Sequence, residues 1–356
     1  MPYDVAVAHF ADPLVTAWPW TPGAGFGVKY ADPPSRPAST AGQGVAFHKN
    51  TDIAVALRFD PFVIAWPWTP GAGFGAKHSD PGVKPAGFAY DVAFRGNTDI
   101  AVAHDLDPFI TAWPWTPGVG FGAKYSDPGV KPAGFGRGVA FCGSTDVAVD
   151  IAVGCANDPF VMAWPWTPGA GFGVKYSDPG VKPTSASLDM AFCGGTDMAV
   201  GSLTDPFITA WPWTPGVGFG AKYSDPGTKP TGVGYGVSFC GSTDIAVGHD
   251  PDPFVTAYPW TPGVGFGAKY SDPGVKPAGW GRGVDFVRDT DMAITHYTTP
   301  FVTAYPWTPG AGFGAKYTNP GVTPTGVGYD TTFWESPLLG AKSANMAAKM
   351  TARGVV

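Results

Sequence analysis

The sequence carries little charge, and it has no long apolar run. Charged residues make up 14% of its 356 residues, and the formal net charge is −6. No block of Lys and Arg stands out, so the chain has no electrostatic footprint for nucleic acid. No apolar stretch approaches the roughly 18 residues of a membrane-spanning helix. We therefore expect neither a nucleic-acid partner nor a membrane span.

Cysteine and glutamate are also scarce. Three of the four cysteines, Cys142, Cys193 and Cys240, follow the same AF or SF dipeptide in successive parts of the chain. Such equivalent positions should lie farther apart than the roughly 7 Å between Cα atoms that a disulfide tolerates, so we expect free, mostly buried thiols. Only Glu335 is glutamate among 28 acidic residues. This bias suits acids in turns, where Asp bonds to the backbone.

The first residues, MPYDVAVAHFADP, lack the basic and apolar regions of a secretory signal peptide. We expect no signal-peptide export. The expected location is a virion, or otherwise the cytoplasm.

What the chain does contain is one motif, AWPWTPG, in seven near-copies. Its first aromatic recurs at intervals of 47 to 51 residues, at Trp18, Trp66, Trp113, Trp164, Trp211, Tyr258 and Tyr305. A strict period of this length indicates a repeat architecture. Although the 51 Gly and 39 Pro would also suit low complexity, regular apolar runs separate the Gly and Pro clusters. The pattern therefore favours many short strands joined by tight turns.

One unit, taken from Gly138, contains four strand signals. They are the runs Gly138–Phe141, Asp146–Gly154, Phe160–Trp164 and Gly171–Tyr176, separated by segments rich in turn formers. Four antiparallel strands in each of seven units predict an all-β, seven-bladed β-propeller over residues 1–335. The chain begins in a second-strand pattern and ends its last repeat in a first-strand pattern. We expect Asp4–His9 to pair with Gly328–Phe333 and close the ring, which removes two exposed edges.

The order GVAF, a short turn, DIAVAHD, PFITAW and a closing strand resembles the WD-repeat-like propellers of environmental bacteria and bacteriophage structural proteins. The resemblance implies a seven-bladed ring that serves as a structural part of a particle. WD repeats carry Asp after the strand-ending Trp, whereas this chain has Pro, as in Trp113-Pro114. We therefore do not expect the polar network in which that Asp takes part.

The two aromatics of WPW suggest different roles. The first is expected to pack between blades. The second follows Pro beside a predicted turn, so we expect partial exposure. A ring of exposed indoles would stack on sugars or dock a partner; the alternative is that each Trp covers the adjacent blade edge. These candidate binding residues are Trp20, Trp68, Trp115, Trp166, Trp213, Trp260 and Trp307.

Other repeated polar residues are expected to be structural. Lys recurs three residues before Asp or Asn, as in Lys29 and Asp32, and should form solvated surface pairs or pack on Trp. Asp precedes each second strand, where side-chain to backbone bonds account for it; this set is Asp52, Asp99, Asp146, Asp197, Asp244 and Asp291. His recurs at the end of that strand, where the other copies have Leu57, Cys155 and Ser202. The histidines are His9, His104, His249 and His296. They lack the short spacing of metal ligands, so we expect no metal site.

Catalysis needs one asymmetric constellation, whereas these polar residues come in sevens, so we expect no enzyme and no cofactor. The C-terminal segment 336–356 breaks the repeat; it has no acid and favours a short helix. It is either a frayed tail or an anchor for a neighbouring chain. The candidate anchor residues are Leu339, Lys342, Met346, Lys349, Met350 and Arg353.

Two functions follow. The first is a structural or adhesion component of a bacteriophage particle, with other virion or assembly proteins as partners. The second is a lectin-like propeller with seven similar pockets for host-surface glycans, in which weak single-site binding gains avidity.

Overall fold

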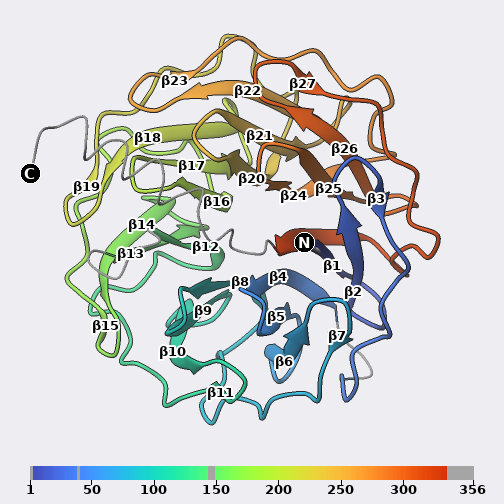
Figure 1. The fold of residues 1–356 in the computed structure, drawn as a ribbon. Coiled ribbons are helices and arrows are strands. Elements are labelled where there is room, and N and C mark those ends of the chain that lie inside the picture. The colour runs from blue at the N-terminus through green and yellow to red at the C-terminus, as the bar shows by residue number, and fades with distance from the viewer. Residues whose placement is uncertain (1–2, 38–40, 143–148, 335–356) are drawn as a thin grey trace, which may run out of the picture.

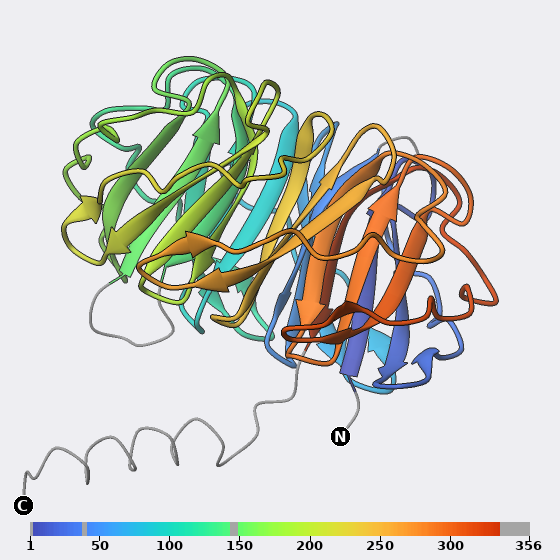
Figure 2. The ribbon, with the colours of Figure 1, turned by 90° about the horizontal axis from the view of Figure 1, so that it is seen from above.

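The computed structural model describes residues 3–37, 41–142 and 149–334. The chain forms seven four-stranded antiparallel sheets arranged as blades around a central axis (Figure 1). Figure 2 shows the same disc from its side. The predicted seven-bladed propeller is confirmed. None of the described residues forms a helix long and apolar enough to cross a membrane.

Each blade runs from a central strand to a two-residue strand at the rim. The innermost strands are β4 (Gly42–His48), β8 (Ala89–Arg95), β12 (Gly136–Cys142), β16 (Ser187–Cys193), β20 (Gly234–Cys240), β24 (Gly281–Val287) and β28 (Gly328–Trp334). The second strands are β1 (Tyr3–His9), β5 (Asp52–Leu57), β9 (Asp99–His104), β13 (Val149–Cys155), β17 (Asp197–Ser202), β21 (Asp244–His249) and β25 (Asp291–His296).

The third strands carry the WPW motif. They are β2 (Val15–Thr21), β6 (Val63–Thr69), β10 (Ile110–Thr116), β14 (Val161–Thr167), β18 (Ile208–Thr214), β22 (Val255–Thr261) and β26 (Val302–Thr308). The outer strands are β3 (Gly25–Phe26), β7 (Gly73–Phe74), β11 (Gly120–Phe121), β15 (Gly171–Phe172), β19 (Gly218–Phe219), β23 (Gly265–Phe266) and β27 (Gly312–Phe313).

Two strand boundaries differ from the predicted ones. The third strand continues through the WPW motif; β14, for example, ends at Thr167, after the predicted end at Trp164. The outer strand is shorter than predicted, since β15 covers only Gly171–Phe172. Beyond Phe172 the chain is still joined to the third strand by single backbone hydrogen bonds, such as the one that Tyr176 N–H donates to Ala163 O at 2.9 Å.

The ring closes by pairing the two ends of the propeller. Strand β1 lies between β28 and β2 in one sheet, and its register runs from Asp4 opposite Trp334 to His9 opposite Gly328. The predicted closure is therefore confirmed. Strand β1 therefore has a paired strand on each side, and residues far apart in sequence complete one blade.

The apolar core lies between neighbouring blades. One cluster, for example, joins Ala101 and Ile110 of one blade to Ile151 and Trp164 of the next. The first aromatic of WPW is fully buried in every blade, as predicted for packing between blades. Burial of about 150–250 Å² of each ring contributes roughly 4–6 kcal/mol before the entropy cost of ordering is subtracted.

Valines of the closing strand should be far more important for stability than valines at the rim. Val5 and Val7 of β1 are fully buried, and truncating both to Ala should lower the free energy of unfolding by about 2 kcal/mol each. Val28 and Val174 are 88% exposed, and the same truncations there should change it by less than about 0.5 kcal/mol. Denaturant unfolding of the two double variants measures both. Equal losses in the two pairs would contradict closure through β1.

Candidate functional site: the central channel

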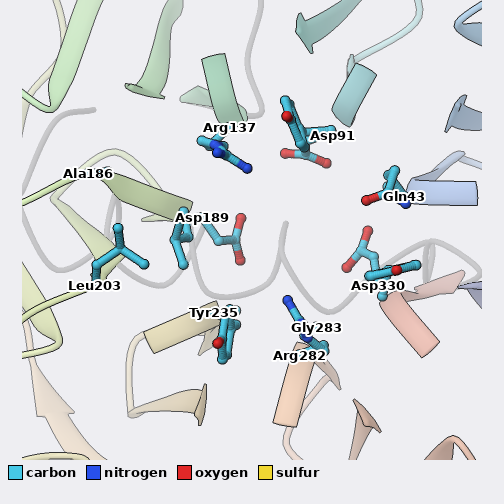
Figure 3. Close-up of a pocket in the computed structure, with 15 residues that line it drawn as sticks. Gln43, Asp91, Arg137, Ala186, Asp189, Leu203, Tyr235, Arg282, Gly283 and Asp330 are labelled. Carbon is cyan, nitrogen blue, oxygen red and sulfur yellow. The ribbon is translucent and has the colours of Figure 1, made fainter. Parts of the chain in front are cut away.

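The repeat symmetry breaks where the innermost strands enter the central channel. The second and third residues of these strands differ from blade to blade and line a cavity of about 310 Å³. The polar lining residues are Gln43, Tyr90, Asp91, Arg137, Asp189, Tyr235, Arg282, Tyr329 and Asp330. Figure 3 shows the carboxylates and guanidinium groups converging on the channel centre from different strands. A singular polar set in a cavity is the usual form of a ligand site.

Three aspartates occupy the same position in β8, β16 and β28, and each links its blade to the next. The backbone N–H of Val139 donates to Asp91 Oδ2 at 2.8 Å, and Val237 N–H donates to Asp189 Oδ2 at 2.8 Å. Val45 N–H donates to Asp330 Oδ2 at 2.9 Å. These side chains therefore tie neighbouring innermost strands together.

Glycine at the equivalent position of the preceding blade makes this arrangement possible. A Cβ placed on Gly44 would lie 2.7 Å from the Cα of Asp91, which is closer than two such atoms can approach. The strands could not come this close with a side chain at that position. The alternation of Asp and Gly is thus a packing requirement of the channel wall.

The channel raises the pKa of these carboxyl groups. Burial raises the pKa of Asp91 to about 8, with repulsion from Asp189 adding to the effect. Burial also raises the pKa of Asp189 to about 6. The pKa of Asp330 rises well above its ordinary value through burial and through the charges of Asp91 and Asp189. Near neutral pH the wall therefore carries fewer negative charges than its composition suggests.

Arg137 and Arg282 bring positive charge into the same cavity. Each guanidinium group stacks on a tyrosine ring of the neighbouring blade: Arg137 lies 4.3 Å from the Tyr90 centroid, and Arg282 lies 4.2 Å from that of Tyr235. Within the described ranges, neither group forms a hydrogen bond or an ion pair, and the Nε atoms of both are buried without a partner. The rings fix the direction of both side chains.

This combination can bind an anion. Fixed guanidinium groups are donors for carboxylate or phosphate oxygens. The nearby carboxyl oxygens already accept backbone N–H groups, as in Asp91 with Val92 and Val139. No group of three or more His, Cys, Asp or Glu side chains in the described parts of the chain could hold a metal ion.

The seven candidate binding tryptophans lie elsewhere and are buried. Trp20, Trp68, Trp115, Trp166, Trp213, Trp260 and Trp307 are only 1–3% exposed. The expected partial exposure is wrong because the third strand runs through the motif. Two residues apart on a strand, both aromatics point to the same face, into the space between blades. These indoles therefore offer no open ring face to a sugar, and they cover the adjacent blade edge, which was the alternative.

Trp115 shows how each second tryptophan is held. Phe94, Phe121 and His78 surround it edge to face, with ring centroids 5.0 to 5.4 Å away. Its Nε1 donates to Asp52 Oδ2 at 3.2 Å, across the blade interface. The ring is therefore a packing unit with one satisfied polar atom.

The acceptors of these tryptophans are the aspartates that begin the second strands. Trp68 Nε1 donates to Asp4 Oδ2 at 3.0 Å, and Tyr30 Oη donates to Asp4 Oδ1 at 2.6 Å. The same Tyr30 hydroxyl accepts from Gly71 N of the next blade at 3.1 Å. In the described residues the hydrogen bonds of these aspartates run to Tyr, His, Thr, Arg and Trp side chains and to the next blade and not to the local backbone, so the predicted local bonding is wrong and these aspartates are buried links between blades.

The Asp–Tyr–Trp links occur around the ring with small variations. Beside Asp52, His78 takes the place of the tyrosine. At Asp99, Arg95 and Thr98 contact the carboxylate in place of a tryptophan. Trp166 Nε1 therefore has no hydrogen-bond partner in the described parts of the chain. In the blade of β13 the linking carboxylate is Asp150 and not the predicted Asp146, which lies outside the described residues. Asp150 accepts from Trp213 Nε1 at 3.0 Å. The four extra residues of this repeat shift the register of the motif.

The tyrosines of these links were missed in the sequence. They recur after the repeated Lys, as Tyr30, Tyr125, Tyr176, Tyr223, Tyr270 and Tyr317. Their constant distance of 26 residues from the buried aspartate was the available signal. The channel residues were missed for the opposite reason, because each polar type recurs in only one to three of the seven blades.

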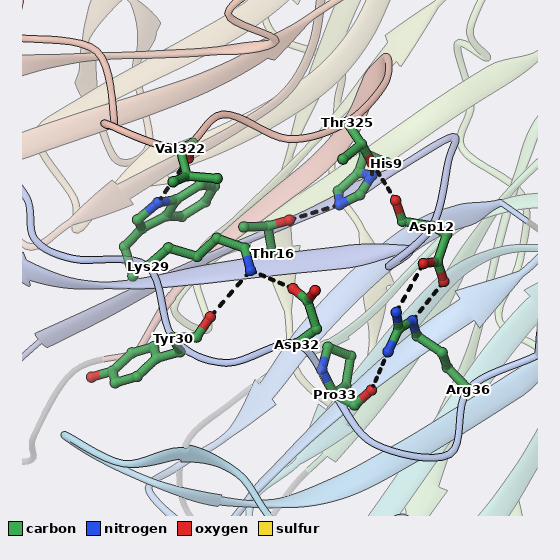
Figure 4. Close-up of polar contacts among 11 residues, drawn as sticks. His9, Asp12, Thr16, Lys29, Tyr30, Asp32, Pro33, Arg36, Val322 and Thr325 are labelled. Atoms are coloured by element: carbon green, nitrogen blue, oxygen red, sulfur yellow. Dashed lines mark hydrogen bonds and ion pairs between the residues drawn. The ribbon is translucent and has the colours of Figure 1, made fainter.

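The repeated histidines are structural. His9 Nε2 and Thr16 Oγ1 share a hydrogen bond of 2.8 Å within one blade, and His104, His249 and His296 bond to Thr in the same way (Figure 4). Burial lowers the pKa of each of them to about 4. They are thus neutral imidazoles that join the second strand to the third.

The cysteines and the lysines match the expected roles. All four thiols are free and buried, and burial raises their pKa, to about 12 for Cys142 and Cys155. Lys29 pairs with Asp32 at the rim, and Figure 4 shows this pair beside that of Arg36 with Asp12. The candidate tail residues, from Leu339 to Arg353, lie outside the described residues.

Removal of one linking hydroxyl should destabilise the ring. Tyr30→Phe leaves Asp4 Oδ1 and Gly71 N without their partner, and we expect a loss of about 1–3 kcal/mol in the free energy of unfolding. The matched control is Tyr297→Phe, at a half-exposed ring, with an expected change below about 0.5 kcal/mol. Denaturant titration measures both. A Tyr30 variant as stable as its control would refute the role of the link.

The channel carboxyl groups should make the fold less stable as pH rises from 7.5 to 8.5. The pKa of Asp91 is about 8 in the folded chain against an ordinary value of 3.8, so the folded chain binds more protons in this range. Stability is then present at low pH and lost as pH rises through the folded value. Above about pH 7.5 the buried histidines, with a folded pKa of about 4 and an ordinary value of 6.5, are almost fully deprotonated in both states and add little to this change. Asp91→Gly, with the residue found at this position in four blades, should flatten the profile. Urea midpoints that stay constant or rise would contradict it.

Comparison with known proteins supports the fold. No protein family profile and no curated protein matches the sequence. A putative 6-phosphogluconolactonase from Bacteroides fragilis superposes with a TM-score of 0.70 at 10% identity, over 94% of this chain and 98% of that chain. A protein from Lactobacillus plantarum gives 0.63 at 13%, over 94% and 100%. The WD40 β-propeller domain of Doa1 gives 0.54 at 12%, over 81% and 86%. At these identities the likeness shows the fold alone, a β-propeller with a WD40 neighbour.

Proposed function

We propose that this protein is a non-enzymatic interaction platform, and that it serves as a structural or adhesion component of a bacteriophage particle. The particle role comes from the resemblance of the repeats to propellers of phage structural proteins. The observation that carries the platform role is the way in which the ring holds its outer turns. Each blade fixes the connection that leaves the preceding blade, so the rim presents rigid, repeated turns.

The first aromatic of WPW makes this attachment. Trp113 Nε1 donates to the carbonyl oxygen of Val83 at 3.1 Å, and Trp164 Nε1 donates to that of Val130 at 3.1 Å. In the following blade Trp211 Nε1 donates to Val181 O at 3.0 Å. Where the aromatic is Tyr, as in Tyr305, its hydroxyl donates to the same position, Val275 O, at 2.8 Å.

The side chains on these fixed turns are exposed and apolar. Val83, Val130 and Val181 are 55%, 54% and 56% exposed and belong to three successive blades. A partner that binds preorganised turns does not incur the entropy cost of ordering them. The rim therefore supplies the apolar contacts that protein interfaces use.

The rim charges are largely matched within the chain. Lys84 pairs with Asp60, Lys131 with Asp107 and Lys182 with Asp158, next to the exposed valines. Self-paired surface charges contribute little to stability and leave little net field. This arrangement favours a neighbouring protein that makes apolar contact over a strongly charged polymer.

The lectin alternative loses its main support, because the seven tryptophans on which it depended are buried. The repeated Asp, Tyr, His and Thr residues are occupied with one another inside the ring. These observations support a binding role over catalysis.

Negative charges introduced at three neighbouring rim turns should block assembly without unfolding the ring. The test variant carries Val83→Asp, Val130→Asp and Val181→Asp. Its matched control carries Asn50→Asp, Asn97→Asp and Ser242→Asp, in exposed turns between the first and second strands of three blades. In the cells from which the protein comes, tagged wild type and control should sediment with a large assembly, whereas the valine variant should remain free, at least tenfold reduced in the assembly. Melting of all three chains should agree within a few degrees.

Wild type that sediments alone would refute the platform role in a particle. A valine variant that assembles like wild type would show that the contact surface does not include these turns.

A further inference from the structure

Two partly buried arginines that line the channel cavity have no acidic partner within the described residues. Around the rim, basic side chains have acidic partners from the same chain, such as Lys131 with Asp107. Inside the cavity, Arg137 and Arg282 stack on tyrosine rings and, across the described residues, bond to no acceptor. A guanidinium group that is partly withdrawn from water and bonds to no acceptor of the chain keeps its charged donors available for an anionic ligand.

Nearby acids form no hydrogen bond or ion pair with the two arginines in the described residues, although the charge of Arg137 acts on Asp105. The carboxylate oxygens of Asp91 accept from Val92 N at 2.7 Å and Val139 N at 2.8 Å, and those of Asp330 accept from Thr331 N at 2.8 Å and Val45 N at 2.9 Å. They are thus aimed at the backbone of neighbouring strands. No ion pair within 4 Å joins either arginine to an acid in the described parts of the chain.

We propose that the mouth of the central channel is a binding site for a small organic anion, whose carboxylate or phosphate group is held by Arg137 and Arg282. This site is independent of the rim turns proposed above. The two guanidinium groups come from β12 and β24, on different sides of the cavity, and both line it (Figure 3). They supply directed donors for the oxygens of one anionic group or of an anion with two such groups.

The remaining wall suits the uncharged part of such a ligand. Gln43 Nε2 has no hydrogen-bond partner in the described ranges. The rings of Tyr90, Tyr235 and Tyr329 add apolar faces with hydroxyl groups to the lining. A cavity of about 310 Å³ lies at the small end of known ligand pockets, which excludes a polymer from its interior.

The aspartates of the cavity wall make the affinity for an anion depend on pH. The titratable and charged groups that face the cavity are Asp91 on β8, Arg137 on β12, Asp189 on β16, Tyr235 on β20, Arg282 on β24, and Tyr329 and Asp330 on β28, with Tyr90 also on β8. The raised pKa values of the three aspartates keep part of their charge neutralised below pH 7. As pH rises from 6 to 8 they ionise and repel an anion, so the affinity should fall.

The test measures binding of three probes to the full chain by calorimetry at pH 6. The probes are D-glucose 6-phosphate and D-glucuronate, with D-glucose as the uncharged control, and they separate phosphate from carboxylate recognition. At least one anion should bind, and its affinity should exceed that of glucose at least tenfold and fall between pH 6 and pH 8. Arg137→Gln and Arg282→Gln should each weaken it at least tenfold, because each removes a charged donor.

Two features keep this test decisive. Strand β4 carries glutamine, Gln43, at the position equivalent to the two arginines, so Arg→Gln is compatible with an innermost strand. A melting curve checks that each variant is folded. Lys131→Gln, at an exposed ion pair, is the matched control and should bind like wild type. The proposal is overturned if neither anion binds at 10 mM, if glucose binds equally well, or if folded arginine variants bind like wild type.

Discussion

A buried carboxylate shared between two blades is the interaction on which the ring depends. Asp4 accepts hydrogen bonds from Tyr30 and from Trp68 of the next blade, and similar links recur around the ring. An unpaired carboxylate at this depth would cost several kcal/mol, so each blade is stable only with its neighbour in place. The apolar clusters between blades add most of the area buried, while the carboxylates fix how the blades are positioned.

This constraint explains why the motif repeats so strictly. In the link of Asp4, the aspartate lies on β1 and Trp68 lies on β6 of the next blade, whereas Tyr30 lies in the connection after β3. A change in one repeat would leave a polar group unpaired in the next. The interface that lacks the full set shows the consequence: Trp166 Nε1 has no acceptor in the described residues, where Arg95 approaches Asp99.

Much of the fold could be predicted from the sequence, because period and strand alternation determine it. The number of blades, the four strands of each blade and the pairing of β1 with β28 follow from the spacing of the repeats. The exposure of the second tryptophan could not be predicted, since Pro114 suggests a turn although β10 continues through it to Thr116. Asp150 could not be identified as the linking acid, because register after an insertion depends on which residue reaches Trp213. The channel site was hidden, since Arg137 and Arg282 lie far apart in sequence and repeat in no other blade.

The structure thus divides its residues into two groups. The repeated Asp, Tyr and Trp residues hold the ring together, whereas Arg137 and Arg282, which occur in two blades only, line the channel and are available for recognition. A saturation scan that reads out the folded fraction of every single-residue variant by protease resistance tests this division most directly. In every link that has all three residues, substitution of the Asp, the Tyr or the Trp should reduce the folded fraction of the protein. Polar substitutions of Arg137 and Arg282 should leave the folded fraction unchanged. Tolerance at the linking positions, or loss of folding at the two arginines, would contradict the account.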